Sequence, residues 1–336
     1  MARGTEMLRP IALIARRVVT AVLAVLLCVS ALSPAPSWAQ AYPTKPVRMI
    51  LPYLGGAEFV GRWLATKISP SLGQQMIVDP RPGAGGNLGH EAAAKAAPDG
   101  YTLMLASTPF VLNPLLNPRT PYGITRDFVP IELVATLPNV LAVHPSVPAK
   151  SVRELVQLAR ANPGKLAYGS GTIGSTSHLA GELLRSLTKA DILLVPYKGA
   201  TFALVGAMSG EVDVVIPAAS AVEPYVKNKR MRVLAVLDTK RLASMPDVPT
   251  SAEAGMPQLQ IVNWYVLTAP AATPRSIVDR LNAEAVKVMQ SPDTRAYFAG
   301  LGGEPISSTP EQAATFLRDE TERWTKVIRA AGIKTE

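Results

Sequence analysis

The sequence predicts an α/β protein whose sheets are mainly parallel and flanked by helices. Short β-branched runs alternate with longer amphipathic stretches, and the connections between them are short. This alternation is typical of strand–helix–strand units, which produce parallel sheets covered on both faces. About 295 residues follow an N-terminal leader, which is enough for two lobes of ordinary size. The apolar spacing alone does not distinguish one large sheet from two smaller ones.

Nine runs have the composition and length of buried strands. They are Val47–Pro52, Met76–Val78, Tyr101–Ala106, Val140–Val143, Leu166–Ser170, Ile192–Val195, Val212–Ile216, Val233–Val236 and Val262–Leu267.

Start signals mark three of the helices expected between and after these runs. Ser151 followed by Glu154 predicts a capped helix through Arg160, which Asn162-Pro163-Gly164 ends. Thr273-Pro274 and Thr309-Pro310 each place a capping hydroxyl before a proline at the first helical position. The last helix should run from about Pro310 to Ala330.

Residues 1–41 predict a secretory leader. After several arginines comes a mainly apolar run of 15 residues, Val18–Leu32, and then small residues around Ala39 and Ala41. This order is that of a signal peptide, and the run is too short to span a membrane comfortably. We expect cleavage after Ala41, with Ala39 as the alternative, and a soluble exported product. A twin-arginine signal at Arg16-Arg17 fits its flanking residues poorly.

The composition of the exported part excludes several classes of site. Cys28, the only cysteine, lies in the leader, so disulfides, thiolate metal sites and a cysteine nucleophile are not expected. The formal charge of +9 falls to +6 without the four arginines and one glutamate of residues 1–41. The remaining basic residues are scattered and aromatic residues are few, which does not favour nucleic-acid binding. A modest positive field favours anionic solutes.

Three Gly-rich loops each join an expected strand to an expected helix: Leu51–Glu58, Arg81–Gly89 and Ser170–His178. In open α/β sheets, ligands bind at the carboxyl ends of the strands. A helix N-terminus there offers unpaired N–H groups and a positive dipole end, worth roughly 0.3–1 kcal/mol to an anion. These loops suit carboxylate or phosphate oxygens, although a single loop of this kind is more often only a tight turn.

The loop Arg81–Gly89 fits neither common nucleotide-binding motif. A P-loop requires lysine after its last glycine, whereas His90 follows Gly89. The dinucleotide pattern counted from Gly83 requires glycine where Leu88 stands. We therefore interpret this loop as mainly structural and expect no cofactor.

The candidates for catalysis are few. The three histidines, His90, His144 and His178, provide no pair at metal-ligand spacing, and no Gly-x-Ser-x-Gly motif occurs. Ser175 and His178 lie three residues apart at an expected helix start, where serine is most simply a cap. We expect no enzyme; a secreted Ser/His hydrolase is the weaker alternative.

Eight segments, spread over nearly the whole exported chain, occur in the order typical of one family. They are Tyr42–Arg48, Arg81–Gly89 (RPGAGGNLG), Ala97–Thr102, Val143–Ser151, Gly174–Glu182 (GSTSHLAGE), Val195–Gly199 (VPYKG), Pro246–Thr250 and Glu253–Gly255. Each segment is weak alone, but the ordered set after a leader is specific. The chain resembles the Bug family, the TctC-like solute receptors of tripartite tricarboxylate transporters.

The resemblance implies a periplasmic binding protein of two lobes, type II-like, that closes on its ligand like a flytrap. Each lobe is expected to be a mainly parallel sheet flanked by helices, and two crossing strands are expected near Val140–His144 and Val262–Leu267. Residues 42–143 and 265–336 would then form the first lobe and residues 144–264 the second.

The resemblance also implies the ligand-binding residues and the partners. In this family, loops of both lobes hold ligand carboxylates through main-chain N–H groups, hydroxyls and water. The expected ligand is a di- or tricarboxylate or an aromatic acid, the expected partners are membrane permease subunits, and the receptor is expected to be a monomer without metal or cofactor. Matched position by position, the first lobe contributes Tyr53, Gly55, Gly56, Ser107 and Thr108, and the second contributes Ser170, Thr172, Gly174, Ser175, Thr176 and Tyr197.

Two departures from the family pattern bear on specificity. The stretch from Tyr53 to Arg62 is two residues shorter than usual, with Glu58 where an aspartate is expected; Glu58 and Arg62 most simply form a helix-surface ion pair. After Val212–Ile216, where the family often has Asp-Asn, this chain has Pro217-Ala218-Ala219. This apolar wall suggests, as a hypothesis, a larger or more hydrophobic carboxylate, aromatic acids included. Presentation of the ligand to a sensor kinase instead of a permease stays open.

Overall fold

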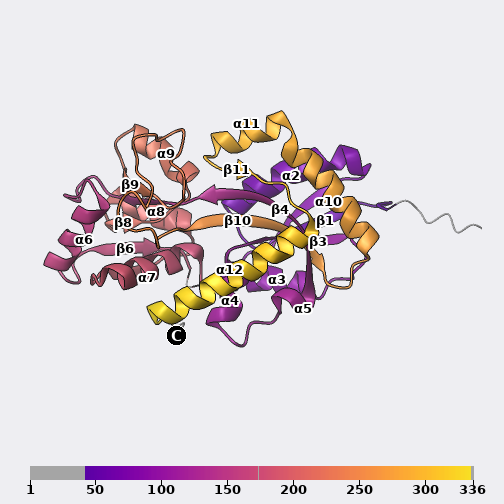
Figure 1. Ribbon diagram of the computed structural model, residues 1–336, viewed down its shortest axis with the longest axis horizontal. Coiled ribbons are helices and arrows are strands. Elements are labelled where there is room, and N and C mark those ends of the chain that lie inside the picture. The colour runs from indigo at the N-terminus through magenta and orange to yellow at the C-terminus, as the bar shows by residue number, and fades with distance from the viewer. Residues whose placement is uncertain (1–41, 173, 334–336) are drawn as a thin grey trace, which may run out of the picture. The chain divides into compact units, whose positions relative to one another are not determined.

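The computed structural model describes residues 42–172 and 174–333, so the leader predicted over residues 1–41 lies outside the described residues. The described strands form two sheets, one of six strands and one of five, with helices on their faces (Figure 1). The α/β class predicted from the alternation of strands and helices is confirmed.

The first sheet has the strand order β11-β4-β10-β3-β1-β2. Helices α2 and α10 pack together on one side of it, and α4 and α12 on the other (Figure 1). Every residue of β3 is buried because helices cover both faces there. The elements of this part are β1 (Val47–Leu51), α2 (Gly56–Leu72), β2 (Met76–Pro80), η1 (Ala84–Gly86), α3 (Asn87–Ala94), β3 (Thr102–Ser107), α4 (Pro109–Leu116), α5 (Ile124–Asp127), β4 (Phe128–Pro138), β10 (Val262–Pro270), α10 (Arg275–Gln290), α11 (Pro292–Gly300), β11 (Glu304–Pro305) and α12 (Pro310–Ala331).

The second sheet has the strand order β7-β6-β8-β5-β9. Its strands are short, and helix α8 packs on β6 and β8 while α7 packs on β6. The elements of this part are β5 (Val140–Val143), α6 (Val152–Ala161), β6 (Ala167–Ser170), α7 (Thr176–Thr188), β7 (Leu193–Pro196), α8 (Ala200–Ser209), β8 (Val214–Val215), α9 (Ala219–Lys227) and β9 (Arg232–Val236).

Both sheets are mixed, which corrects the expectation of mainly parallel sheets. The parallel pairs are β1 with β2 and β3, and β6 with β7 and β8. Every antiparallel pair among the described strands contains β4, β5 or β10. A helical crossover returns the chain in the same direction and produces parallel pairs. Within the described residues, no helical crossover leads to β4, β5 or β10 from a neighbouring strand of the same sheet. These three strands pair antiparallel with their neighbours.

The chain passes from the first sheet to the second at Asn139, which lies between β4 and β5. It returns through residues 237–261 to β10, which lies beside β4 (Figure 1). At this point the Asn139 side chain donates to Ile261 O at 3.0 Å and accepts from Asn263 Nδ2 at 3.0 Å. The two passages between the sheets are therefore hydrogen-bonded to each other.

Strand β4 was not among the strands predicted from the sequence. Its segment contains Pro130 and the charged residue Glu132, which obscure the apolar pattern. The pairing with β10 joins Leu267 to Glu132 and Thr268 to Pro130, so Ile131 is skipped and forms a bulge. Proline is tolerated in a sheet at such an irregularity because no ladder hydrogen bond is needed there.

Helix starts were predicted well where a hydroxyl caps the backbone. The Ser151 hydroxyl accepts from Glu154 N at 3.2 Å, and the Thr309 hydroxyl accepts from Gln312 N at 3.2 Å, as the sequence predicts. The prediction for Thr273 is wrong: its hydroxyl donates to Pro270 O at 2.7 Å and caps nothing, and α10 begins at Arg275.

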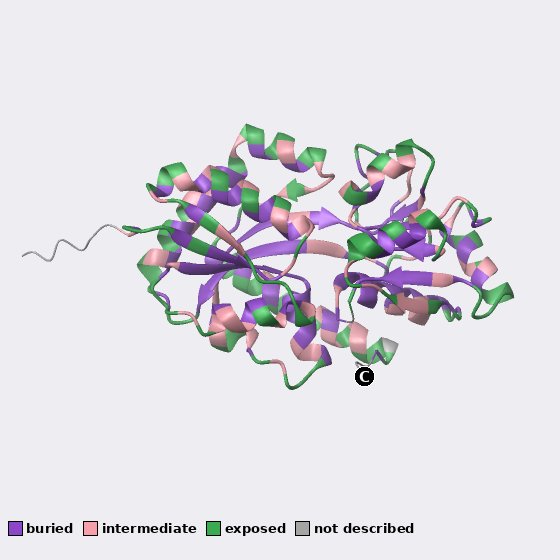
Figure 2. Ribbon diagram, turned by 180° about the vertical axis from the view of Figure 1, so that it is seen from behind, coloured by how far each residue is buried: buried purple, intermediate pink, exposed green. Residues whose placement is uncertain are grey.

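The buried core is continuous between the two sheets. One apolar cluster includes Ile50 and Met104 of the first sheet, Leu141 and Tyr168 of the second, and Trp324 of α12. Helix α12 packs on β4 and α4 and also contacts α7, so it links both parts (Figure 1). Figure 2 shows the buried strands enclosed by helices whose outer faces are exposed. Among the described residues, no helix is long and apolar enough to cross a membrane.

Candidate ligand-binding site

The predicted residues of the first sheet lie where parallel strands end and helices begin. Strands β1 and β3 are parallel neighbours, so their carboxyl ends lie together. Tyr53 follows β1, and Ser107 is the last residue of β3. Gly55 is the N-cap of α2, Gly56 is its first residue, and Thr108 is the N-cap of α4. The structure thus brings these five residues to one edge of the first sheet.

The predicted residues of the second sheet share this arrangement. Ser170 ends β6, which pairs in parallel with β7, and Tyr197 follows β7. Its backbone N–H donates to Ser170 O at 2.9 Å. The next loop leads from β6 into α7, with Ser175 as the N-cap. The residues of this group are Ser170, Thr172, Gly174, Ser175, Thr176 and Tyr197.

The side chain of Tyr53 is held by a residue that the sequence analysis did not place in the site. The Tyr53 hydroxyl and His90 Nε2 share a hydrogen bond of 2.7 Å, and the Tyr53 ring lies against Gly86. His90 is fully buried, and burial lowers the pKa of its imidazole from 6.5 to about 3. The imidazole is therefore neutral, and it also packs edge-on against Phe110 and Tyr122. Gly86 belongs to the loop Arg81–Gly89, so this loop packs against the Tyr53 ring.

Glu58 is turned toward its own helix. Its carboxylate accepts from Arg62 Nη2 at 3.3 Å, which confirms the predicted ion pair, and from Gly55 N at 3.4 Å. Gly55 has a φ of 78°, a left-handed conformation that favours glycine. Gly56 packs against the Tyr265 hydroxyl, where a β-carbon would clash. The start of α2 is therefore shaped by two glycines and closed on one side by Glu58.

Thr108 carries a hydroxyl that the fold leaves unused. The residue is fully buried, and its Oγ1 has no hydrogen-bond partner among the described atoms. It immediately precedes α4, whose first residue is Pro109. Buried hydroxyls are normally paired. The arrangement leaves one donor and acceptor at the edge where the other predicted residues lie.

The described residues of the loop from Ser170 to Thr176 are held by the side chains of Tyr168, Ser175 and Ser177. The Ser175 hydroxyl accepts from His178 N at 3.3 Å, as the capping interpretation predicts. The Ser177 hydroxyl accepts from Gly171 N at 2.8 Å, and the Tyr168 hydroxyl donates to Ser177 O at 2.5 Å. This preformed loop presents the N-terminus of α7 to the space beyond the sheet.

The ring of His178 is hydrogen-bonded to the same loop. Its Nδ1 accepts from Gly174 N at 3.4 Å, and burial lowers the pKa of its imidazole below 6.5. Ser175 Oγ has its backbone donor and lies 3.2 Å from Ser177 Oγ. Within the described residues, no bond joins the Ser175 hydroxyl to the His178 ring.

Tyr197 joins the group through its backbone. Its hydroxyl packs against Gly206 of α8 and has no hydrogen-bond partner among the described atoms. Desolvation raises the pKa of this phenol, and Glu211 raises it further. The side chain is therefore held by α8, and the residue's contact with Ser170 is through the main chain.

Asn113 of α4 lies between the two groups and was missed by the sequence analysis. Its Nδ2 donates to Gly85 O at 2.8 Å and to Asn87 Oδ1 at 2.9 Å. A β-carbon on Gly174, whose φ is 82°, would lie 3.2 Å from Asn113 Oδ1. The loop of the second sheet thus approaches the first-sheet helix α4 directly.

Comparison with known proteins decides the family. The model of the tripartite tricarboxylate transporter family receptor (TctC) matches residues 60–333. The chain belongs to this family. Protein BugT of Bordetella pertussis is 37% identical over 304 residues, which is 89% of this chain and 93% of the relative. A protein from the tcbD-tcbE intergenic region of Pseudomonas sp. (strain P51) is 39% identical over 86% of this chain and 87% of its own length.

Solved structures of TctC-type receptors share the fold. R. palustris Rpa4515 with adipate has a TM-score of 0.82 and 33% identity, over 87% of this chain and 99% of that one. MatC from Rhodopseudomonas palustris with bound malate has a TM-score of 0.79 and 29% identity, over 85% and 100%. Both carry dicarboxylates. The similarity supports a two-lobed periplasmic-binding-protein fold for this TctC-family chain.

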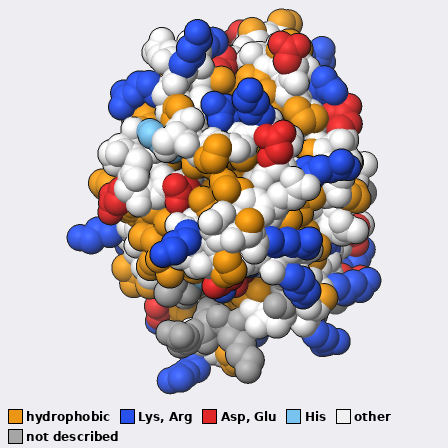
Figure 3. Space-filling view, turned by 90° about the vertical axis from the view of Figure 1, so that its left-hand side faces the viewer, with side chains coloured by type: hydrophobic (Ala, Val, Ile, Leu, Met, Phe, Trp, Pro, Cys, Tyr) orange, Lys and Arg blue, Asp and Glu red, His pale blue; other side chains and the backbone are white. Residues whose placement is uncertain are grey.

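Two further observations bear on nucleic-acid binding and metal binding, which the composition does not favour. At the end of the molecule formed by the second sheet, Lys and Arg side chains are spread over the surface and form no stripe (Figure 3). In the part of the chain that the structure describes, no group of three or more His, Cys, Asp or Glu residues is placed to hold a metal ion.

Proposed function

We propose that this chain is an exported periplasmic receptor that binds a small carboxylate between its two lobes and passes it to the membrane permease subunits of a tripartite tricarboxylate transporter. One observation carries the proposal: the N-termini of α2, α4 and α7 stand at the carboxyl ends of β1, β3 and β6. Such N-termini attract anions through unpaired N–H groups and the helix dipole. Family membership and the predicted leader support export and transport.

The predicted binding residues are uncharged, so ligand affinity would come from N–H groups and hydroxyls. Gly55 and Gly56 allow close approach to the backbone of α2, and Thr108 adds an unpaired hydroxyl. Ser175 and Thr176 add hydroxyls at the start of α7. A preformed donor set of this kind holds a carboxylate without the desolvation cost of a buried cationic side chain.

The end of β8 supports an apolar remainder for the ligand. Strand β8 is a parallel neighbour of β6, so its carboxyl end lies beside Ser170. The residues that follow it are Ile216, Pro217 and Ala218, and the Pro217 carbonyl already accepts from Val140 N at 3.0 Å. This wall offers methyl and ring carbons where a polar pair is usual in the family. A longer aliphatic or an aromatic carboxylate fits such a wall better than citrate does.

A thermal-shift screen with adipate, malate, citrate and benzoate tests the proposal. A ligand at 100 times its dissociation constant should stabilise the folded chain by about 2.7 kcal/mol. We expect stabilisation by adipate or benzoate that exceeds stabilisation by citrate, and calorimetry on each stabilising acid then gives its affinity. Stabilisation by citrate alone would contradict the apolar wall. If none of these acids and no other small carboxylate stabilises the chain, the receptor function is contradicted.

A further inference from the structure

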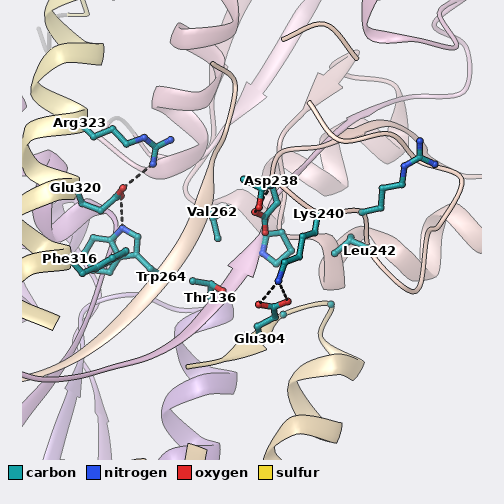
Figure 4. A pocket seen from close by; sticks show the side chains of 15 residues that line it. Thr136, Asp238, Lys240, Leu242, Val262, Trp264, Glu304, Phe316, Glu320 and Arg323 are labelled. Carbon is teal, nitrogen blue, oxygen red and sulfur yellow. Dashed lines mark hydrogen bonds and ion pairs between the residues drawn. The ribbon is translucent and has the colours of Figure 1, made fainter. Parts of the chain in front are cut away.

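A cavity of about 270 Å³ lies beside strands β4 and β10, and charged side chains that line it are paired with one another (Figure 4). Lys240 Nζ lies 3.1 Å from Glu304 Oε1. Glu320 accepts from Trp264 Nε1 at 2.8 Å and from Arg323 Nη1 at 2.9 Å. A ligand would have to break these bonds to gain its own, so these groups are not free to hold one.

The candidate site differs, because polar atoms around it are buried without a hydrogen-bond partner. Among the described residues these atoms include His90 Nδ1, Thr108 Oγ1 and the Tyr197 hydroxyl. The other ring nitrogen of His90, Nε2, lies 2.7 Å from the Tyr53 hydroxyl. His90 therefore has one nitrogen in use and one without a partner. Which of the two carries the proton decides what Tyr53 can offer a ligand.

The hydrogen bond between Tyr53 and His90 can form in two ways. The imidazole is neutral, so one nitrogen carries a proton and the other a lone pair. If Nε2 donates to the Tyr53 oxygen, the Tyr53 proton has no acceptor among the described atoms and Nδ1 is left with an unpaired lone pair. If the Tyr53 hydroxyl donates to Nε2, only the proton on Nδ1 lacks a conventional acceptor. The second arrangement leaves one group unpaired instead of two.

The aromatic rings around His90 favour the same arrangement. The imidazole meets the rings of Phe110 and Tyr122 edge-to-face, at 64° in each case, with centroids 5.3 Å and 4.6 Å away. Aromatic faces carry partial negative charge, so they attract an N–H and repel a lone pair. A proton on Nδ1 is therefore better accommodated among these rings than a bare lone pair.

The Tyr53 hydroxyl is turned into the protein and away from solvent. Burial raises the pKa of the phenol well above 10, and His90, its partner, is fully buried. The hydroxyl end of the ring packs against Gly86, where a β-carbon would clash. The residue as a whole is only half-buried. The surface that Tyr53 leaves exposed therefore consists of ring carbons and main chain.

We propose that His90 is a positioning residue that accepts the Tyr53 hydroxyl proton, so that Tyr53 meets the ligand with its ring and not with a hydrogen-bond donor. The ligand carboxylate is then left to the N–H groups at the start of α2 and to the free Thr108 hydroxyl, while the ring packs against the apolar part of the ligand. The contact with the ligand rests on the proposed receptor function, whereas the proton arrangement does not.

Nuclear magnetic resonance tests the proton arrangement without ligand. In the full chain with ¹⁵N-labelled histidine, the signals of His90 are those that His90→Gln removes. We expect Nδ1 to have the shift of a protonated nitrogen and Nε2 that of a nitrogen with a lone pair, at both pH 5 and pH 8. Tyr53→Phe should move the Nε2 signal because it removes the donor. A protonated Nε2, or an imidazole that titrates between these pH values, would overturn the proposal.

Tyr122→Phe is the matched control for this measurement. The Tyr122 hydroxyl is buried in the same cluster, but it donates to Phe110 O at 2.9 Å. Tyr122→Phe should leave the Nε2 signal in the range of a hydrogen-bonded lone pair, whereas Tyr53→Phe moves it out of that range. Equal movement in both variants would overturn the assignment of Tyr53 as the donor.

A double-mutant cycle with adipate as the probe tests the effect on binding. His90→Leu leaves the buried Tyr53 hydroxyl without an acceptor and should weaken adipate binding, measured by calorimetry, by about fivefold or more. In the Tyr53→Phe background the same change should weaken it by less than about twofold, because no hydroxyl is left unpaired. His90→Gln keeps an acceptor and should bind adipate more tightly than His90→Leu. Tyr53→Ala should lose more affinity than Tyr53→Phe, because it also removes the ring.

The cycle has outcomes that count against the proposal. An equal loss of affinity in Tyr53→Phe and Tyr53→Ala would show that the hydroxyl, and not the ring, contacts the ligand. Equal losses from His90→Leu in both backgrounds would show that His90 does not act through Tyr53. If His90→Leu fails to fold, the comparison of Tyr53→Phe with Tyr53→Ala decides. If the parent chain binds no adipate, the proposed ligand class fails, whereas the histidine signals still test the proton arrangement.

Discussion

Glu132 on β4 is fully buried, and neither of its carboxyl oxygens has a hydrogen-bond partner among the described atoms. Desolvation raises the pKa of this carboxyl from 4.5 to about 9. The folded chain therefore keeps this proton at neutral pH, whereas the unfolded chain releases it near pH 4.5. Between these two values the unfolded state binds fewer protons, so the stability that the group contributes falls as pH rises.

Glu132→Gln should remove this pH dependence. We expect the wild-type free energy of unfolding to fall between pH 5 and pH 9 relative to that of the variant, by up to about 1.4 kcal/mol per pH unit. Below pH 4.5 the difference should stop changing. Denaturant titrations at pH 5, 7 and 9 measure it.

The control for this residue is Glu322→Gln, an exposed position on α12. It should follow the wild-type curve at each pH. A Glu132→Gln variant that also keeps the wild-type slope would show that the buried carboxyl ionises as readily in the folded chain as in the unfolded chain.

Among the elements, the helix starts were the most predictable from the sequence, whereas strand β4 was not predicted. The cap formed between Ser175 and His178 joins residues three positions apart, so a short segment of sequence determines its geometry. Strand β4 depends on distant partners, because Thr136 pairs with Trp264 and with Glu304. Long-range pairing of this kind overrides the local pattern. Thr273 is not the cap of α10 because Pro274 takes the N-cap position and the helix begins at Arg275; the Thr273 hydroxyl donates to Pro270 O.

The caps of α7 and α6 make a matched pair of variants. Ser175 and Ser151 each accept a backbone N–H in the same way, but only Ser175 lies in the candidate site. We expect Ser175→Ala and Ser151→Ala each to lower the free energy of unfolding by about 1 kcal/mol. Only Ser175→Ala should weaken carboxylate binding, measured by calorimetry with the best acid from the screen.

The two variants also separate a binding role from a structural one. Equal losses of affinity in both would mean that stability alone governs binding. An unchanged affinity in Ser175→Ala would remove its hydroxyl from the set of ligand contacts and leave the backbone N–H groups of α7 as the donors.

For the molecule as a whole, the α/β class and nine of the eleven described strands followed from the sequence, whereas β4, β11 and the assembly of two mixed sheets did not. The grouping of the site loops was also predictable, because helix starts such as Ser175 and glycines such as Gly55 have local signatures. The residues that support them were not. The hydrogen bond between Tyr53 and His90 joins residues 37 positions apart, and that between Asn113 and Gly85 joins residues 28 positions apart. Such contacts depend on how elements pack, which no short segment encodes.

A single substitution at Asn139 should affect the connection between the two sheets. Its side chain makes two hydrogen bonds that join the passages between the sheets, and its backbone carbonyl accepts from Leu237 N at 2.8 Å. Asn139→Ala should lower the free energy of unfolding by about 1–2 kcal/mol, since each lost bond contributes about 1 kcal/mol. It should also broaden the distance distribution, measured by double electron–electron resonance, between spin labels at Leu88→Cys and Phe202→Cys, two exposed positions on the first-sheet and second-sheet parts, because the two passages lose their side-chain bonds.

Asn282→Ala is the control for this prediction. Asn282 also makes two side-chain hydrogen bonds, to Ile131 O at 2.8 Å and to Ser308 O at 2.7 Å, but both lie within the first-sheet part. The two variants should lose similar stability, and only Asn139→Ala should broaden the distances. Equal broadening in both would mean that a general loss of stability, and not the loss of the Asn139 bonds, broadens the distances. A narrow distribution in Asn139→Ala would mean that the pairing of β4 with β10 holds the two parts without the Asn139 side chain.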